Sequence, residues 1–414
     1  ILRGLVGSEM CIRDSIALDQ EWINLQHGTN QLRAMKNTAA RGIGAAKKSG
    51  DEQAAQRILA EVADLGAQIS EMEKKTDLAM AERDRLRMSI PNILHPDVPV
   101  GADESGNTQH SVHGEKPTFD FEPRTHNELI EMNKWVDLKR AAKIVGSRFF
   151  FLKGDLARLD FALQQFAVNF IRDRGYTFVQ PPVMMNREAY EGVTDLSDFE
   201  TVMYGVEPDN YYMIATSEHP LTAMFMGETI PESDLPLRIV GVSPCFRREV
   251  GSHGQSDLGI WRVHQFTKIE QIIIATPEQS WELQEELLQN CLDLWDALGM
   301  HYEVVNICTG DMGTVAARKY DLEAWIPGAN QYKEIVSCSN CTDYQANRLQ
   351  IRYGQPGHAG QPIAHTLNST AVATSRALVA IMEQNQMEDG RVKIPSALQP
   401  LMGGQEVLEP CSWG

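Results

Sequence analysis

Residues 245–270 read CFRREVGSHGQSDLGIWRVHQFTKIE. Two apolar, strand-like runs in this stretch flank a polar loop that contains three glycines, which predicts a hairpin with a long connection. Side chains alternate with period two along a strand, so we expect Arg247 and Glu249 on one face of the first strand. A guanidinium beside a carboxylate suits a ligand that carries both a phosphate and a hydrogen-bonding base. The stretch therefore predicts a site for such a ligand.

Three further segments offer groups that complement this hairpin. Residues 367–386 read LNSTAVATSRALVAIMEQNQ and predict a strand and turn that lead into a helix, with Arg376 at the helix start. An arginine there is repelled by the helix dipole, so its placement indicates an anionic ligand. Residues 334–340, EIVSCSN, predict a strand edge of polar oxygens, and residues 216–218, Thr-Ser-Glu, add a hydroxyl pair and a carboxylate.

The N-terminal part of the chain has the spacing of a coiled coil. Candidate seam positions alternate at intervals of four and three from Leu18 to Ala46, and the alternation resumes from Ile58 to Ile90 after a polar turn at 49–51. The pattern predicts an antiparallel hairpin of two helices, which forms an arm several tens of ångströms long at about 1.5 Å per residue.

Basic residues gather near the predicted turn of this arm. They are Arg33, Lys36, Arg41, Lys47, Lys48 and Arg57. They form a positive island on a chain whose formal net charge is −18 at pH 7, and such an island is what RNA binding requires of an acidic protein. For an isolated hairpin, a solvated coiled-coil face that serves dimerisation would be the better interpretation.

Length, composition and cysteine pattern limit the class of protein. A chain of 414 residues, 43% hydrophobic and 23% charged, suits two or three soluble globular domains. No apolar run approaches the length of a membrane span, and seven scattered cysteines indicate reduced thiols, so we expect a cytoplasmic protein without a membrane segment. Cys338 and Cys341 form a Cys-x-x-Cys pair followed by two histidines, but only one such pair exists, and we expect no structural zinc.

Taken together, these segments resemble the catalytic core of the class II aminoacyl-tRNA synthetases, in particular the seryl-tRNA synthetase family. Residues 245–270 are similar to the second motif of that class, and residues 367–386 are similar to the third. A helix over 152–173, followed by a strand that two prolines stop, resembles the first motif, which builds the dimer interface of these enzymes. The resemblance covers nearly everything from Leu18 to the C-terminal end.

The resemblance implies an α+β protein: an N-terminal antiparallel two-helix coiled-coil arm, then a class II synthetase catalytic domain with a mainly antiparallel sheet flanked by helices. We expect the arm at 16–91, a linker rich in Pro, Gly, His, Asp and Asn at 92–124, and the catalytic domain at 125–414. Residues 1–15 fit neither the heptads nor a secretory signal. We interpret them as a foreign or mistranslated extension on a truncated arm.

The resemblance also implies ligands. In this family ATP and L-serine give seryl-adenylate, with Mg²⁺ bridging the ATP phosphates, and serine then passes to the 3′ end of tRNA(Ser); whether tRNA(Sec) is also charged stays open. The residues expected to bind ATP are Arg247, Arg248, Glu249, Val263, Phe266, Glu334, Ile335, Val336, Ser337 and Arg376. The residues expected to bind serine are Thr216, Ser217, Glu218, Arg247, Glu270, Asn368 and Thr370.

Individual roles follow from the same resemblance. Arg247 and Arg376 are the expected catalytic residues, at the α-phosphate and the γ-phosphate of ATP. Phe266 would stack on the purine, and Glu334 with Ser337 would hold the Mg²⁺. The six basic residues of the arm would hold the long variable region of the tRNA, and the enzyme would be a homodimer.

Two other functions stay open. A homologue that activates an amino acid but loads a carrier protein would lack the long basic hairpin, which this chain has. A non-catalytic RNA-binding or scaffolding paralogue would tolerate the loss of Arg247, Arg376 or Glu334, and all three are present.

Overall fold

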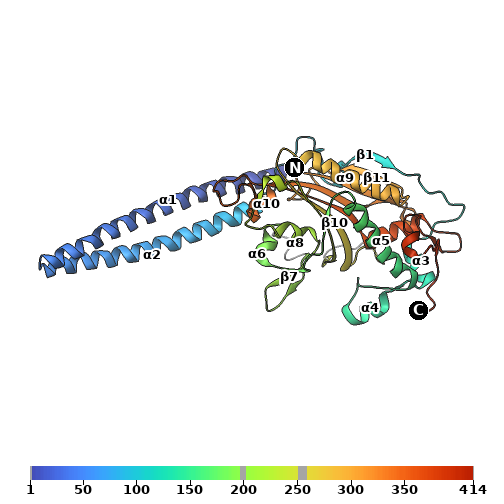
Figure 1. Cartoon of the computed structure of the whole chain (residues 1–414), viewed down its shortest axis with the longest axis horizontal. Helices are drawn as coiled ribbons and strands as arrows, with labels where there is room; N and C mark the ends of the chain where they lie inside the picture. The colour runs from blue at the N-terminus through green and yellow to red at the C-terminus, as the bar shows by residue number, and fades with distance from the viewer. Residues whose placement is uncertain (1, 196–201, 250–258, 414) are drawn as a thin grey trace. The chain divides into compact units, whose positions relative to one another are not determined.

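The computed structural model describes residues 2–195, 202–249 and 259–413, with the backbone alone over 2–10. The chain forms two compact units, residues 1–91 and 92–414. The first unit is a helical hairpin, and the second is built around one large sheet (Figure 1). Within the described ranges, no helix combines the length and the apolar composition that crossing a bilayer would need.

The helical hairpin consists of α1 (Leu2–Lys48) and α2 (Glu52–Ser89), which run side by side in opposite directions (Figure 1). Asp51 caps α2, because its side chain accepts a hydrogen bond from the backbone N–H of Ala54 at 2.9 Å. The predicted seams are confirmed: every seam position from Leu18 onward is buried or half-buried, and most positions between them are exposed. Burial of this seam, rather than the exposed ion pair of Arg33 with Glu73, holds the two helices together.

The second unit contains an eight-stranded sheet with the strand order β1-β11-β12-β13-β15-β10-β9-β4. The strands are β1 (Thr108–His113), β4 (Thr177–Val179), β9 (Leu237–Phe246), β10 (Gln265–Ala275), β11 (Tyr302–Asn306), β12 (Arg318–Ile326), β13 (Gln331–Thr342) and β15 (His365–Ala373). Neighbouring strands are antiparallel except β4, which pairs parallel with β9 at one edge. The predicted α+β fold is therefore confirmed.

Helices α5 (Gly154–Arg172), α9 (Ser280–Ala297) and α11 (Thr374–Gln384) pack against this sheet. Other helices of the described chain are α3 (His126–Asn133), α4 (Leu138–Val145), α6 (Arg187–Glu191), α8 (Glu218–Ala223) and α10 (Tyr344–Leu349). Smaller sheets pair β2 (Val136–Asp137) with β3 (Phe151–Leu152), β5 (Met184–Asn186) and β6 (Gly205–Val206) with β7 (Tyr211–Met213), β8 (Thr229–Pro231) with β14 (Arg352–Gly354), and β16 (Val392–Lys393) with β17 (Val407–Leu408).

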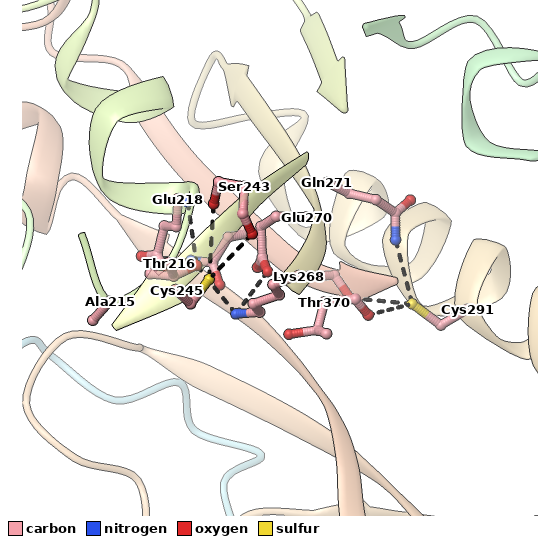
Figure 2. Close-up of polar contacts among 12 residues, drawn as sticks. Ala215, Thr216, Glu218, Ser243, Cys245, Lys268, Glu270, Gln271, Cys291 and Thr370 are labelled. Atoms are coloured by element: carbon pink, nitrogen blue, oxygen red, sulfur yellow. Dashed lines mark hydrogen bonds and ion pairs between the residues drawn. The ribbon is translucent and has the colours of Figure 1, made fainter. Parts of the chain in front are cut away.

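Strand alternation separates a helix-covered face of the sheet from the face that carries the candidate site. On β10 and β15, the side chains of Gln271 and Ser369 lie 3.3 and 3.2 Å from the thiol of Cys291 on α9. Their neighbours Glu270 and Thr370, which are partners in the strand register, point to the other face. Figure 2 shows Gln271 directed toward Cys291, with Glu270 on the opposite side beside Lys268.

Three segments differ from their predicted form. Residues 92–124, expected to be a linker, contribute β1 to the edge of the sheet, where antiparallel pairing with β11 orders them. The strand predicted after the helix at 152–173 is only the three-residue β4. Residues 2–15 form the beginning of α1, and their foreign origin stays a prediction.

Candidate active site

A cavity with an empty volume of about 530 Å³ lies on the face of the sheet opposite α9. Its walls include Arg247 after β9, Phe266 on β10, Ser337 on β13 and Arg376 on α11. Other predicted ATP-binding residues on its walls are Glu249, Val263, Glu334 and Ile335. Two arginines that are far apart in the sequence therefore face one space.

Arg247 is held by the strand ends around it. Its backbone N–H donates to the carbonyl of His264 at 3.0 Å, and its Nε donates to the carbonyl of Ala215 at 3.4 Å. The guanidinium carbon lies 5.4 Å from the ring centroid of Phe266. These contacts fix the direction of the positive charge, so little reorganisation is needed when an anion binds.

The backbone conformation that places Glu249 at the cavity differs from the one that the sequence analysis predicted. We expected Arg247 and Glu249 on one strand face, but β9 ends at Phe246 and Glu249 has a left-handed φ of 46°. A turn, not strand alternation, brings the two side chains together. The predicted connection at 250–258 lies outside the described residues.

Arg148 stabilises this turn, and the sequence analysis missed it. Its Nη1 donates to the backbone carbonyl of Glu249 at 2.7 Å, and its own carbonyl accepts from the N–H of His264 at 3.0 Å. Arg148 itself has a left-handed φ of 63°. It lies in a turn about 100 residues upstream of the hairpin, and no local pattern marked it.

Arg376 lies in the first turn of α11, as predicted, where it contacts Glu334. Its Nη1 donates to the backbone carbonyl of Glu334 at 2.9 Å and lies 3.2 Å from the carboxylate Oε2. The guanidinium carbon is 5.5 Å from the ring centroid of Trp261, which also lines the cavity and which the sequence analysis did not single out. Burial raises the pKa of Glu334, but Arg376 and then Lys319 outweigh it, so the pKa lies below its ordinary value.

The oxygens of Glu334 and Ser337 suit a hard divalent cation such as Mg²⁺. Asp321, the register partner of Ser337 on β12, has a buried Oδ1 without a hydrogen-bond partner in the described structure. Among the described residues, no group of three or more His, Cys, Asp or Glu side chains is arranged to hold a metal. A Mg²⁺ at Glu334 and Ser337 would need further oxygen ligands from phosphate or water.

The Cys-x-x-Cys pair takes part in hydrogen bonds on β13. The thiol of Cys338 donates to the carbonyl of Gln284 at 3.8 Å, and the sulfur of Cys341 accepts from the side-chain amide of Asn368 at 3.4 Å. Burial raises the pKa of both thiols, so both are protonated at neutral pH.

A second, more open cavity shares part of its wall with the first. Five residues line both cavities: Arg247, Lys268, Glu334, Ser337 and Thr370. Three other residues predicted to bind serine, Thr216, Glu218 and Asn368, lie on the walls of the second cavity. The residues predicted to bind serine and those predicted to bind the ATP phosphates thus lie on neighbouring cavities with shared walls.

Glu218 is held by two side-chain amides. Its Oε1 accepts hydrogen bonds from Gln345 at 2.8 Å and from Asn368 at 3.1 Å. Burial raises the pKa of Glu218, while the nearby charges of Lys268 and Arg247 oppose that rise. The sequence analysis did not name Gln345, which donates to Glu218, or Lys268, which lines the cavity.

Glu270 differs from its predicted position on the pocket wall. Its side chain is fully buried and lines neither cavity, whereas Lys268, two residues before it, lines both. The ammonium of Lys268 lies 2.6 Å from Glu270 Oε2 and donates to the hydroxyl of Thr216 at 3.2 Å (Figure 2). Neither oxygen of Glu270 makes a hydrogen bond of good geometry within the described residues, so this ion pair is its main contact.

Besides Glu270, three predicted ligand residues line neither cavity. Arg248 is exposed, and its backbone N–H donates to the carbonyl of Val202 at 2.9 Å. Ser217 is buried, and its hydroxyl has no hydrogen-bond partner among the described residues. Val336 belongs to the main hydrophobic core, because strand alternation turns it away from the face that carries Ser337.

The mainly antiparallel sheet and the two arginines on one cavity define the catalytic core of a class II aminoacyl-tRNA synthetase. A family model described as "tRNA synthetase class II core domain (G, H, P, S and T)" matches residues 204–385. A second model, "Seryl-tRNA synthetase N-terminal domain", matches residues 3–94, which include most of the stretch interpreted as foreign.

Full-length relatives identify the family. The serine–tRNA ligase of Methanocella arvoryzae is 50% identical over 398 residues, which are 96% of this chain and 93% of that protein. The seryl-tRNA synthetase of Pyrococcus horikoshii, solved in complex with ATP, matches with a TM-score of 0.90 and 41% identity over 99% of this chain and 96% of that one. The cytoplasmic serine–tRNA ligase of Naegleria fowleri, solved with AMP, matches with a TM-score of 0.81 and 34% identity over 97% and 93%. The chain belongs to the seryl-tRNA synthetase family, as predicted.

Proposed function

We propose that the protein is a serine–tRNA ligase. It activates L-serine with ATP to seryl-adenylate and pyrophosphate, then transfers the seryl group to the 3′ end of tRNA(Ser). The observation that supports this most strongly is the pair Arg247 and Arg376 on one cavity, which shares part of its wall with a second cavity lined by hydroxyl, amide and carboxylate groups. The charging assay described below also tests tRNA(Sec) as a second acceptor.

In the first step, the serine carboxylate attacks the α-phosphorus of ATP, and the bond to the bridging oxygen of the β-phosphate breaks. Arg247 holds the α-phosphate and stabilises the charge that develops on it. Arg376 holds the γ-phosphate, so the triphosphate keeps the direction that in-line attack needs. Phe266 stacks on the adenine, and Glu249 accepts from its amino group.

Glu334 and Ser337 also place side-chain oxygens on the wall of the cavity proposed to bind ATP. Mg²⁺ bound with ATP neutralises phosphate charge. Glu334 and Ser337 are the residues that would hold it, since both line the cavity and the lowered pKa of Glu334 keeps its carboxylate ionised.

Serine is selected by polar groups that would lose their partners with a smaller substrate. Thr216, Glu218, Asn368 and Thr370 line the second cavity, and Glu270 lies behind Lys268. A pocket built to bind a hydroxyl rejects alanine strongly, because its buried polar groups would be left unpaired. The pocket therefore favours serine over alanine.

The arm is the proposed tRNA-binding element. Arg33 is paired with Glu73 on the other helix, at 2.7 Å, and Lys36 lies on the half-buried seam. The other four of the six basic residues, Arg41, Lys47, Lys48 and Arg57, are exposed near the turn. These four are therefore the strongest candidates for contacts with tRNA phosphates.

The proposed assembly is a cytoplasmic homodimer joined through α5 and β4. Phe161 on α5 is 73% exposed and Phe178 on β4 is 44% exposed, and large exposed aromatic side chains are typical of interfaces. Size-exclusion chromatography with light scattering tests this assembly, with twice the 46.3 kDa chain mass expected.

One pair of assays separates this function from the two alternatives. The protein is tested for ATP–pyrophosphate exchange with each of the twenty amino acids and then for charging of unfractionated tRNA. We expect serine-dependent exchange and seryl-tRNA. Exchange without charging would favour a carrier-loading homologue, and the absence of both would favour a non-catalytic paralogue. Arg247→Ala should abolish exchange, whereas Arg391→Ala, which removes a half-buried arginine outside both cavities, should not.

A further inference from the structure

Lys268 occupies the junction between the phosphate side and the amino-acid side of the site. It lies two residues before Glu270 on β10, so both side chains project from the same face of the strand. Only 8% of Lys268 is exposed, and Glu270 is completely buried. The ammonium bridges Glu270 and Thr216, at 2.6 and 3.2 Å, while it forms part of the wall of both cavities.

A buried carboxylate stays ionised only if a nearby positive charge replaces the lost hydration. Lys268 is the charged group that does this for Glu270, and the side chain of Thr370 adds a smaller favourable interaction. Burial raises the pKa of Glu270 to about 7 even with Lys268 beside it. Without the ammonium the carboxyl group would be neutral at pH 7.

The other titratable groups around Glu270 come from three elements. Glu218 at the start of α8 raises the pKa of Glu270 further, and Arg247 after β9 adds positive charge on the Glu218 side. Cys245 on β9 and Cys291 on α9 interact electrostatically with Glu270, but burial raises the pKa of both thiols, so they stay neutral. Lys268 is therefore the cation in direct contact with Glu270.

We propose that Lys268 is a positioning residue of the serine pocket, which keeps Glu270 as a carboxylate and orients the hydroxyl of Thr216 toward the substrate. This inference rests on the proposed function. A substrate ammonium is attracted by a charged Glu270 and not by a neutral one, so the loss of Lys268 should reduce the affinity for serine. Its loss should appear in the pH dependence of serine use.

The test compares Lys268→Met, Lys268→Gln and Lys268→Arg in ATP–pyrophosphate exchange between pH 6.5 and 9. Met and Gln should lower kcat/KM for serine about fivefold or more at pH 7, because a rise of one pKa unit from about 7 lowers the ionised fraction of Glu270 by about that factor, and the deficit should shrink as pH rises. The KM for ATP should stay within about twofold, and Arg, which retains the charge, should keep most of the activity. Gln keeps a polar side chain, which guards against a variant that fails to fold, and Lys143→Met on the exposed part of α4 is the matched surface control.

A double-mutant cycle distinguishes Glu270 from other targets of Lys268. Because Lys268 also lowers the pKa of Glu218, Lys268→Met is combined with Glu270→Gln. We expect the double variant to lose no more serine affinity than Glu270→Gln alone. A deficit that does not change with pH, an equal loss for ATP, or a further loss in the double variant would overturn the proposal. If the wild-type protein shows no serine-dependent ATP–pyrophosphate exchange, the proposed function itself is wrong, which is a different result from the failure of the Lys268 proposal.

Discussion

The guanidinium of Arg376 lies 3.2 Å from the carboxylate of Glu334, which joins the start of α11 to β13 on the wall of the cavity. The arginine keeps Glu334 ionised, and Glu334 together with Trp261 keeps the arginine directed toward the cavity. One contact thus orients both the cation proposed to bind the γ-phosphate and the anion proposed to bind Mg²⁺.

Arg376→Ala should weaken the use of ATP much more than the use of serine. The substitution removes a charged donor from a preorganised anion site, for which a loss of about 10²–10³-fold in kcat/KM for ATP is expected. ATP–pyrophosphate exchange, with ATP and serine varied separately, measures the two effects. Equal losses for both substrates would show that Arg376 supports the fold of the site instead.

Glu334→Gln should change the dependence of exchange on Mg²⁺. The amide cannot replace the charge of the carboxylate as a ligand of a hard cation, so half-maximal exchange should need several times more Mg²⁺. A Mg²⁺ titration at constant free ATP measures the shift. An unchanged midpoint would remove Glu334 from the proposed metal ligands.

Asn368→Ala should affect serine selectively. Asn368 donates to Glu218 at 3.1 Å, and a hydrogen bond to a charged group contributes roughly 1.5–3 kcal/mol, so kcat/KM for serine should fall about 10- to 100-fold. The KM for ATP is the internal control, since Asn368 does not line the first cavity. Loss of ATP affinity would contradict this assignment.

Charge reversal near the turn of the arm should separate the two steps of the reaction. Replacing Arg41, Lys47, Lys48 and Arg57 by glutamate removes the exposed positive charge without touching the buried seam. Serine-dependent exchange should be unchanged, whereas tRNA charging should be lost at moderate salt because phosphate contacts are lost. Replacing four exposed acidic residues on α2 by glutamine is the matched control. Normal charging by the reversed protein would exclude the arm as the tRNA site.

Gly44→Ala should stabilise the end of α1. A methyl group at Gly44 meets no atom within 4 Å, and a helical glycine costs about 0.5–1 kcal/mol relative to alanine. At Gly42 the methyl would come within 3.4 Å of Ile58, so Gly42→Ala is the comparison that changes packing as well. Hydrogen exchange measures both: residues 40–50 should exchange fast in the free wild-type protein and more slowly in Gly44→Ala. Firm protection of the wild-type segment without RNA would contradict the expected mobility.

Regular periodicity made the arm and the strands of the 245–270 hairpin predictable from sequence. The seam from Leu18 to Ile90 follows from heptad spacing alone, and the hairpin strands follow from apolar runs bounded by glycines. The linker prediction missed β1, because Thr108–His113 is a polar edge strand whose burial pattern carries little hydrophobic alternation.

Site residues were predictable only where they lie in a stretch of sequence that is distinctive by itself. Arg247, Arg376 and Glu334 stand in distinctive stretches, but the partners that orient them come from distant parts of the chain. Arg148 acts through a turn with positive φ, and Lys268 acts through a buried ion pair. Neither is visible as a pattern, because long-range contacts and backbone conformation are properties of the folded chain.

A structure of the protein with a non-hydrolysable ATP analogue and serine tests the central claim most directly. We expect the α-phosphate within hydrogen-bonding distance of Arg247, the γ-phosphate at Arg376 and the adenine ring against Phe266, with serine in the second cavity. A triphosphate that contacts only one of the two arginines, or a nucleotide bound outside this cavity, would contradict the account.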